Sequence, residues 1–96
     1  METQFYITLT LKTPKGFESF AKFFIGNDRY RALAIFKQLK GMHDINEENL
    51  LYLDFLETRE GLPVNVDVIT CTLDQLAENC RIITKELFKL ENLEKF

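Results

Sequence analysis

One turn-like segment of this chain is followed later by a second segment of similar sequence. The segment TPKGF at residues 13–17 is matched 45 residues later by TREGL at residues 58–62. Each copy lies between two strand-like stretches, and the second stretch leads in each case into an amphipathic, helix-like segment. Such a repeat defines the unit from which a fold is built. The pattern therefore predicts two ββα units, at residues 4–41 and 49–93.

The length of the chain limits it to a single hydrophobic core. Its 96 residues are close to the commonest domain size, enough for a two-layer core and too few for two independent ones. We therefore predict one α+β domain over residues 1–96. It is a two-layer sandwich with a four-stranded, mainly antiparallel sheet, ββαββα order along the chain and both helices on one face. The order of the strands within the sheet stays open.

The first hairpin has a strictly alternating strand at residues 5–12, which puts Phe5, Ile7 and Leu9 on one face. The turn chemistry favours a three-residue loop that starts at Pro14, with Thr13 opposite Phe17. Counting outward from that pair, we expect apolar side chains of both strands to share the core face. The expected pairs are Leu11 with Ser19, Leu9 with Ala21, Ile7 with Phe23 and Phe5 with Ile25.

The second hairpin, formed by residues 50–57 and 63–70, has two candidate registers. A copy of the first loop would place Asp54 among the valines of the core face, at a cost of several kcal/mol if its charge is unpaired. A four-residue loop at residues 58–61 avoids that cost. We favour the second register, which puts Asp54, Asn65 and Asp67 on the outer face of the sheet.

Two helices follow the hairpins. Asn27 or Asp28 can cap a first helix that runs to about Lys40, with a buried stripe made of Ala32, Ile35, Phe36 and Leu39. Thr72 and Gln75 have the spacing of a capping box at the start of the second helix. That helix is expected to outrun the first by roughly two turns. Its far end would then need another subunit to cover it.

If both helices cover the same face of the sheet, the opposite face presents a group of aromatic and apolar side chains. Contiguous exposed apolar patches usually mark interaction sites. We therefore predict a homo-oligomer, most simply a dimer, that associates through the sheet face, a strand edge or the end of the second helix. The residues expected at this interface or ligand site are Tyr6, Phe20, Phe24, Tyr52, Asp54 and Ile69.

Two alternatives stay open for this surface. It can line a small-molecule site at a subunit interface, built from Tyr6, Phe24, Tyr52 and Asp54, in a binding protein or a small enzyme. Alternatively, the loops or the C-terminal tail of the same protomer cover it. A nucleic-acid platform is disfavoured, because the sequence pI is 5.1 and the aromatic residues are not interleaved with basic clusters.

The chain carries no motif of a catalytic, cofactor or metal site. His43 and Asp44 in an acidic loop are the one grouping that resembles a cation or acid–base site, and such a pair in a polar connection is usually solvated. We expect a non-enzymatic interaction module without cofactor or metal. The start of the chain lacks signal-peptide features and no stretch is long and apolar enough to span a membrane, which favours the cytoplasm and reduced Cys71 and Cys80.

Overall fold

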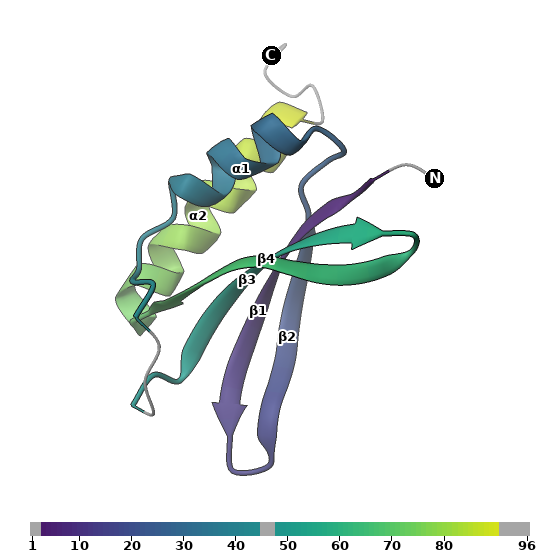
Figure 1. Cartoon of the computed structure of the whole chain (residues 1–96). Coiled ribbons are helices and arrows are strands. Elements are labelled where there is room, and N and C mark those ends of the chain that lie inside the picture. The colour runs from purple at the N-terminus through teal and green to yellow at the C-terminus, as the bar shows by residue number, and fades with distance from the viewer. Residues whose placement is uncertain (1–2, 45–47, 91–96) are drawn as a thin grey trace.

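The computed structural model describes residues 3–44 and 48–90, which form a four-stranded sheet and two helices (Figure 1). The sheet is antiparallel throughout, with the strands in the order β2-β1-β3-β4. The α+β class and the ββαββα order predicted from the sequence are confirmed. The elements are β1 (Phe5–Thr13), β2 (Gly16–Phe24), α1 (Arg29–Lys37), β3 (Leu51–Arg59), β4 (Leu62–Cys71) and α2 (Leu73–Leu90).

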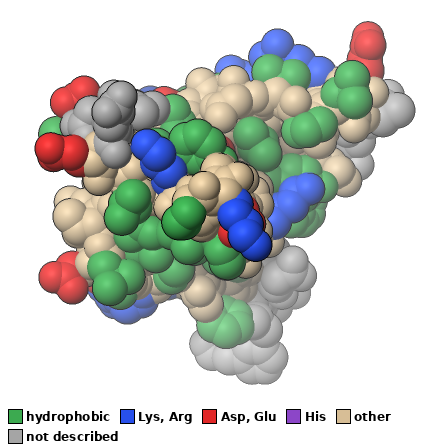
Figure 2. Space-filling view, turned by 90° about the horizontal axis from the view of Figure 1, so that it is seen from below, with side chains coloured by type: hydrophobic (Ala, Val, Ile, Leu, Met, Phe, Trp, Pro, Cys, Tyr) green, Lys and Arg blue, Asp and Glu red, His purple; other side chains and the backbone are tan. Residues whose placement is uncertain are grey.

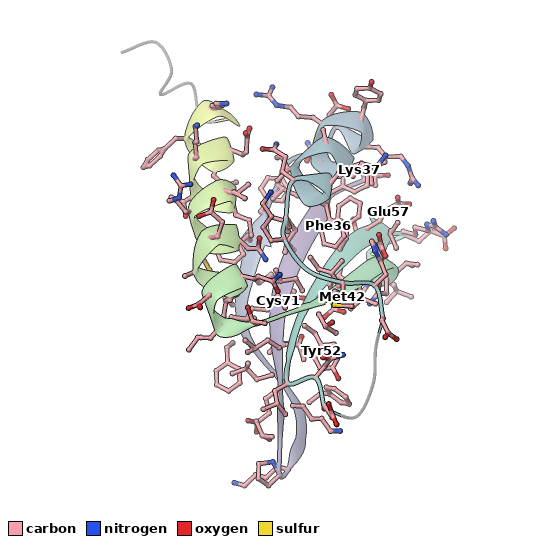
Figure 3. All side chains as sticks on the ribbon, turned by 90° about the vertical axis from the view of Figure 1, so that its left-hand side faces the viewer. Phe36, Lys37, Met42, Tyr52, Glu57 and Cys71 are labelled. Carbon is pink, nitrogen blue, oxygen red and sulfur yellow. The ribbon has the colours of Figure 1, made fainter. Side chains whose placement is uncertain are left out.

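Both helices cover one face of the sheet, which we call the inner face, and the opposite face is the outer face (Figure 1). The core is built around Phe55, whose ring stacks on Phe5 and on Phe36 of α1, with centroids 5.9 and 5.2 Å apart. Figure 3 shows Phe36 between α1 and the sheet. The other buried apolar residues of this core are Ile7, Ile25, Ala32, Ile35, Leu53, Ile69 and Ile83.

The helix starts follow the predicted capping chemistry. Asp28 caps α1 by accepting hydrogen bonds from the backbone N–H groups of Tyr30 and Arg31. At the start of α2, the Thr72 hydroxyl accepts from the Gln75 N–H while the Gln75 side chain accepts from the Thr72 N–H. The capping box is therefore present. The first helix is shorter than predicted, since α1 ends at Lys37 rather than near Lys40.

The first hairpin turns more tightly than predicted. Thr13 pairs with Gly16 instead of Phe17, so the loop contains two residues. Further along, Leu9 pairs with Ala21 as expected, but Leu11 pairs with Glu18 rather than Ser19. The two-residue loop shifts the pairing near the turn by one residue, and a β-bulge at Phe20 restores the expected register from Leu9 onward.

The second hairpin also has a two-residue loop, so the predicted four-residue loop is wrong. Glu60 and Gly61 both have positive φ, of 53° and 82°, which suits the tight hairpin turn. A bulge at Val66 then reverses which side of the sheet the following side chains lie on. Asn65 lies on the outer face as predicted, but Asp67 and Ile69 pair with inner-face residues of β3.

The two hairpins have the same internal layout. Their turns and their bulges are displaced by 46 residues, as from Phe20 to Val66. The sequence repeat has a shift of 45 and so aligns Gly16 with Gly61. In the structure, however, Gly61 lies in a turn and Gly16 is the first residue of β2. The similar sequence motifs therefore occupy positions that differ by one residue.

Candidate interaction surface

The two edges of the sheet are very different. At the β4 edge, Met42 forms a bridge with Thr70, in which each N–H donates to the carbonyl of the other, at 2.9 and 2.8 Å (Figure 3). Pro63, near the start of β4, has no backbone N–H and so removes one further hydrogen-bond donor from this edge. Among residues 3–44 and 48–90, this is the one bridge outside the named strands. No segment within these ranges pairs with the free side of β2.

The uncovered strand β2 is rich in exposed aromatic residues. Phe17, Phe20 and Phe24 are 64%, 57% and 45% exposed. A nine-residue edge strand with exposed apolar side chains is a template for pairing with another chain. Viewed from the end toward which the β1–β2 hairpin projects, hydrophobic side chains gather in a patch with lysine or arginine side chains at its border (Figure 2).

The outer face next to β2 holds two aromatic pairs. Tyr6 contacts Phe24 with ring centroids 5.4 Å apart, and the Lys22 ammonium lies 4.3 Å from the centroid of the Tyr6 ring. Toward the other end of β2, Phe17 meets the edge of the Tyr52 ring at 5.4 Å. In both pairs, a β2 ring is the more exposed member and a ring from a central strand is the more buried one.

The carboxylate of Asp54 lies in the middle of the outer face and is well supplied with donors. One oxygen accepts from the Thr10 hydroxyl at 3.1 Å, and the other accepts from the Asn65 side-chain amide at 3.1 Å. Asp67 lies on the opposite face and therefore does not pair with it. Asp54 consequently anchors three strands to one another by hydrogen bonds.

A recess of about 430 Å³ opens on the outer face beside Tyr6. Its polar wall is internally bonded: the Tyr6 hydroxyl donates to Gln4 at 2.8 Å, and the Gln4 N–H donates to the Thr58 hydroxyl at 2.9 Å. Lys22 is the one charged side chain among the described residues of the lining. The remaining lining residues are Leu56, Gly61 and Pro63.

The structure brings some of the predicted site residues together and separates others. Tyr6 and Phe24 are in contact, whereas Phe20 lies at the bulge of β2 and is 57% exposed. Tyr52 is on the outer face but only 6% exposed, since Phe17 packs on it and its hydroxyl donates to the Asn49 carbonyl at 3.0 Å.

The expected outer-face position of Ile69 is wrong, because this side chain is 4% exposed and belongs to the core. Phe17 was not predicted as a site residue. The three-residue loop assumed from the sequence paired it with Thr13, whereas it lies opposite Lys12 on the outer face. The predicted contact at the far end of the second helix falls beyond Leu90, outside the described residues.

The other side chains that could take part in acid–base or thiol chemistry are paired with neighbouring residues of the fold. Glu57 is 7% exposed and is paired with Arg29 at the start of α1 and with Arg59, whose Nε is 2.7 Å away (Figure 3). The His43 Nε2 atom lies 3.2 Å from the Oδ2 atom of Asp67. Burial raises the pKa of the Cys71 thiol, and the nearby Cys80 adds to this effect, while a hydrogen bond with the Asn79 side chain opposes it. Cys71 is therefore held in its unreactive thiol form.

Two kinds of functional feature are absent from residues 3–44 and 48–90. No group of three or more histidine, cysteine, aspartate or glutamate side chains is arranged to hold a metal ion there. No helix in this part of the chain has the length and hydropathy required to cross a membrane.

Comparison with known proteins gave no significant match to a protein-family model, a curated protein or a solved structure. The open β2 edge and the outer face beside it are therefore the features that indicate a function.

Proposed function

We propose that this protein is a homodimeric interaction module that associates through the free edge of β2. The observation that carries this proposal is the contrast between the two edges: β4 is paired with Met42 and contains Pro63, whereas β2 has no proline and pairs with no further segment of residues 3–44 and 48–90. Natural sheets usually protect an exposed edge with charge, proline or a covering segment. Among the described residues, β2 has two charged side chains and a bulge but no proline and no covering segment, and its three exposed phenylalanines make it suited to pairing.

A second copy of the same strand is the partner that this edge fits. Two-fold symmetric interfaces are self-complementary and are the commonest arrangement among soluble oligomers. Edge pairing would satisfy the backbone groups of both strands and remove apolar rings from water on the same side of an extended sheet. Because the outer faces of both protomers would be continuous, the two aromatic pairs next to β2 would lie within or beside the contact.

A small-molecule site is the second candidate, and the recess beside Tyr6 is the observation that favours it. With Lys22 as the one charged side chain that the described residues contribute to its lining, the recess would suit a small anion with an apolar or aromatic body. The cytoplasmic location expected from the sequence stays a prediction, and free Cys71 and Cys80 are in keeping with a reducing compartment.

The proposed dimer is tested by replacing Phe17 with lysine and measuring mass by sedimentation velocity. Phe17→Lys places a charge on the pairing edge, where contact with a second strand would bury it, so we expect a monomer at concentrations at which the native chain is a dimer. Tyr30→Lys is the matched control, since Tyr30 is 87% exposed on α1. It should leave the dimer intact. A native chain that is monomeric, or equal effects of both variants, would contradict the proposal.

A further inference from the structure

The register of the proposed β2–β2 contact can be derived from the hydrogen bonds of β1. Toward β3, the Lys12 N–H donates to the Leu50 carbonyl and the Gln4 carbonyl accepts from Thr58. Toward β2, the Phe5 carbonyl accepts from the Ile25 N–H. Even-numbered residues of β1 therefore direct their backbone groups to β3, and odd-numbered residues direct theirs to β2.

This alternation identifies the β2 residues whose backbone groups point to the free edge. They are the partners of even-numbered β1 residues, which make no ladder hydrogen bonds toward β2. The bulge at Phe20 makes the spacing along β2 uneven, with an extra residue in the middle. The four outward-directed residues are Phe17, Ser19, Lys22 and Phe24, opposite Lys12, Thr10, Thr8 and Tyr6.

We propose that two copies of β2 pair antiparallel with Phe17 opposite Phe24 of the partner subunit and Ser19 opposite Lys22 of the partner subunit. The inference rests on the proposed dimer and specifies its geometry. In an antiparallel pair, directly opposed residues exchange hydrogen bonds only if both direct their backbone groups toward the partner. This register opposes all four outward residues, and a shift by one or two residues in either direction leaves some of them without a matching partner.

The bulge does not disturb this register. The interval from Ser19 to Lys22 in one strand lies against the interval from Lys22 to Ser19 in the other, so the extra residue occurs in both. The two-fold axis passes between Phe20 and Ala21, perpendicular to the sheet. Both outer faces then lie on one side of a continuous sheet.

The side chains are as well matched as the backbone. Phe24, which already contacts Tyr6, would lie beside Phe17 of the partner subunit, which contacts the partner's Tyr52. The result is a row of four rings across the dimer, present twice because of the symmetry. Cross-strand aromatic pairs stabilise sheets beyond the area that they bury. On this outer face, the register also keeps the two Lys22 ammonium groups away from direct opposition.

The register is tested by disulfide cross-linking between two different single variants. One copy carries Ser19→Cys and the other carries Lys22→Cys, both with Cys71→Ser and Cys80→Ser, and the copies are co-expressed with tags of different length. Opposed residues in the proposed register have Cα atoms within the range that a disulfide can bridge. We expect the mixed pair to dominate the covalent dimer after mild oxidation, by about tenfold over the Ser19→Cys or Lys22→Cys pairs with themselves.

A control pair of variants distinguishes failure of the proposed register from failure of the proposed dimer. Glu18→Cys paired with Lys22→Cys samples a register shifted by one residue and should not cross-link. A dimer by sedimentation that cross-links preferentially through this control or through identical residues would overturn the register and leave the proposed dimer standing. A monomeric mass would overturn both.

Amide hydrogen exchange on the unmodified chain gives an independent readout. The amides of Ser19, Lys22 and Phe24 should exchange slowly at concentrations that favour the dimer and rapidly on dilution, because their protection depends on the second subunit. Equal exchange at both concentrations would contradict the proposed pairing, whatever the behaviour of the cysteine variants.

Discussion

Asn79 is a single residue that holds the segment after α1 to α2. It is fully buried on α2, its side-chain oxygen accepts from the Lys40 N–H at 2.6 Å, and its amide donates to the Lys40 carbonyl at 2.8 Å. The sequence analysis did not single it out because it is polar. Its spacing from Leu76 and Ile83, three and four residues away, nevertheless places it on the buried stripe of α2.

Replacing Asn79 by alanine should lower the free energy of unfolding by about 2 kcal/mol, because it leaves both backbone groups of Lys40 without their partner. Urea unfolding monitored by circular dichroism measures the change. Asn65→Ala is the control, since that amide donates to Asp54 on the exposed side of the sheet and should cost less than about 1 kcal/mol. Equal losses in the two variants would show that Asn79 has no special role in joining the segment after α1 to α2.

Glu60 carries a backbone strain that a substitution can relieve. Its φ of 53° lies in the left-handed region, and the asparagine–glycine pair is the preferred sequence for such a two-residue turn. Glu60→Asn should therefore raise the free energy of unfolding by about 0.5–1 kcal/mol. Lys15→Asn in the first turn is the control, because Lys15 does not have a positive φ. A gain of the same size in both turns would argue against strain at Glu60.

At the scale of the elements, the sequence predicts the strands and helices well and the faces of some residues poorly. Alternation over residues 5–12 has a simple period and one buried side, so it identifies β1 and its core face. The capping residues likewise locate the helix starts. These signals are local, and the structure agrees with them.

The bulges explain most of the errors. Up to Asn65, the predicted faces of β4 are right, but the extra residue at Val66 reverses the alternation and turns Asp67 and Ile69 inward. In β2, the two-residue turn places Ser19 rather than Phe20 opposite Thr10, and the bulge at Phe20 restores the predicted pairing from Leu9 onward. Valine and phenylalanine are ordinary strand residues, so nothing in the local sequence marks either position as a bulge.

Gly41 allows the segment at Met42 to cover the β4 edge. A Cβ at this position would lie 2.5 Å from the Thr70 carbonyl oxygen, which accepts a hydrogen bond from the Met42 N–H. Gly41→Ala should therefore displace Met42, lower the free energy of unfolding by about 1–3 kcal/mol and speed exchange of the Thr70 amide. Two-dimensional NMR measures that exchange.

Gly26→Ala is the matched control for this prediction. Gly26 also has a positive φ, of 101°, but a Cβ there would have no atom within 4 Å. It should cost stability through backbone strain alone and leave the Thr70 amide protected. Unchanged Thr70 exchange in Gly41→Ala would mean that Gly41 does not control the cover of the β4 edge.

For the whole molecule, the path of the chain makes the sheet asymmetric. After α1, the chain reaches the free side of β4, where Met42 pairs with Thr70. Both helices lie on the inner face, so within the described residues the outer face and the β2 edge depend on side chains of the sheet for their cover (Figure 1). The two similar hairpins therefore end in different environments, one closed and one open.

The molar mass of the unmodified chain in solution decides whether the β2 edge pairs with a second copy. Light scattering from low to high micromolar concentration should show a rise toward twice the monomer mass of 11.3 kDa, because the open β2 edge pairs with a second copy. A mass that stays at that of one chain across the whole range would contradict the account, since Phe17, Phe20 and Phe24 would then remain exposed without a partner of the same kind.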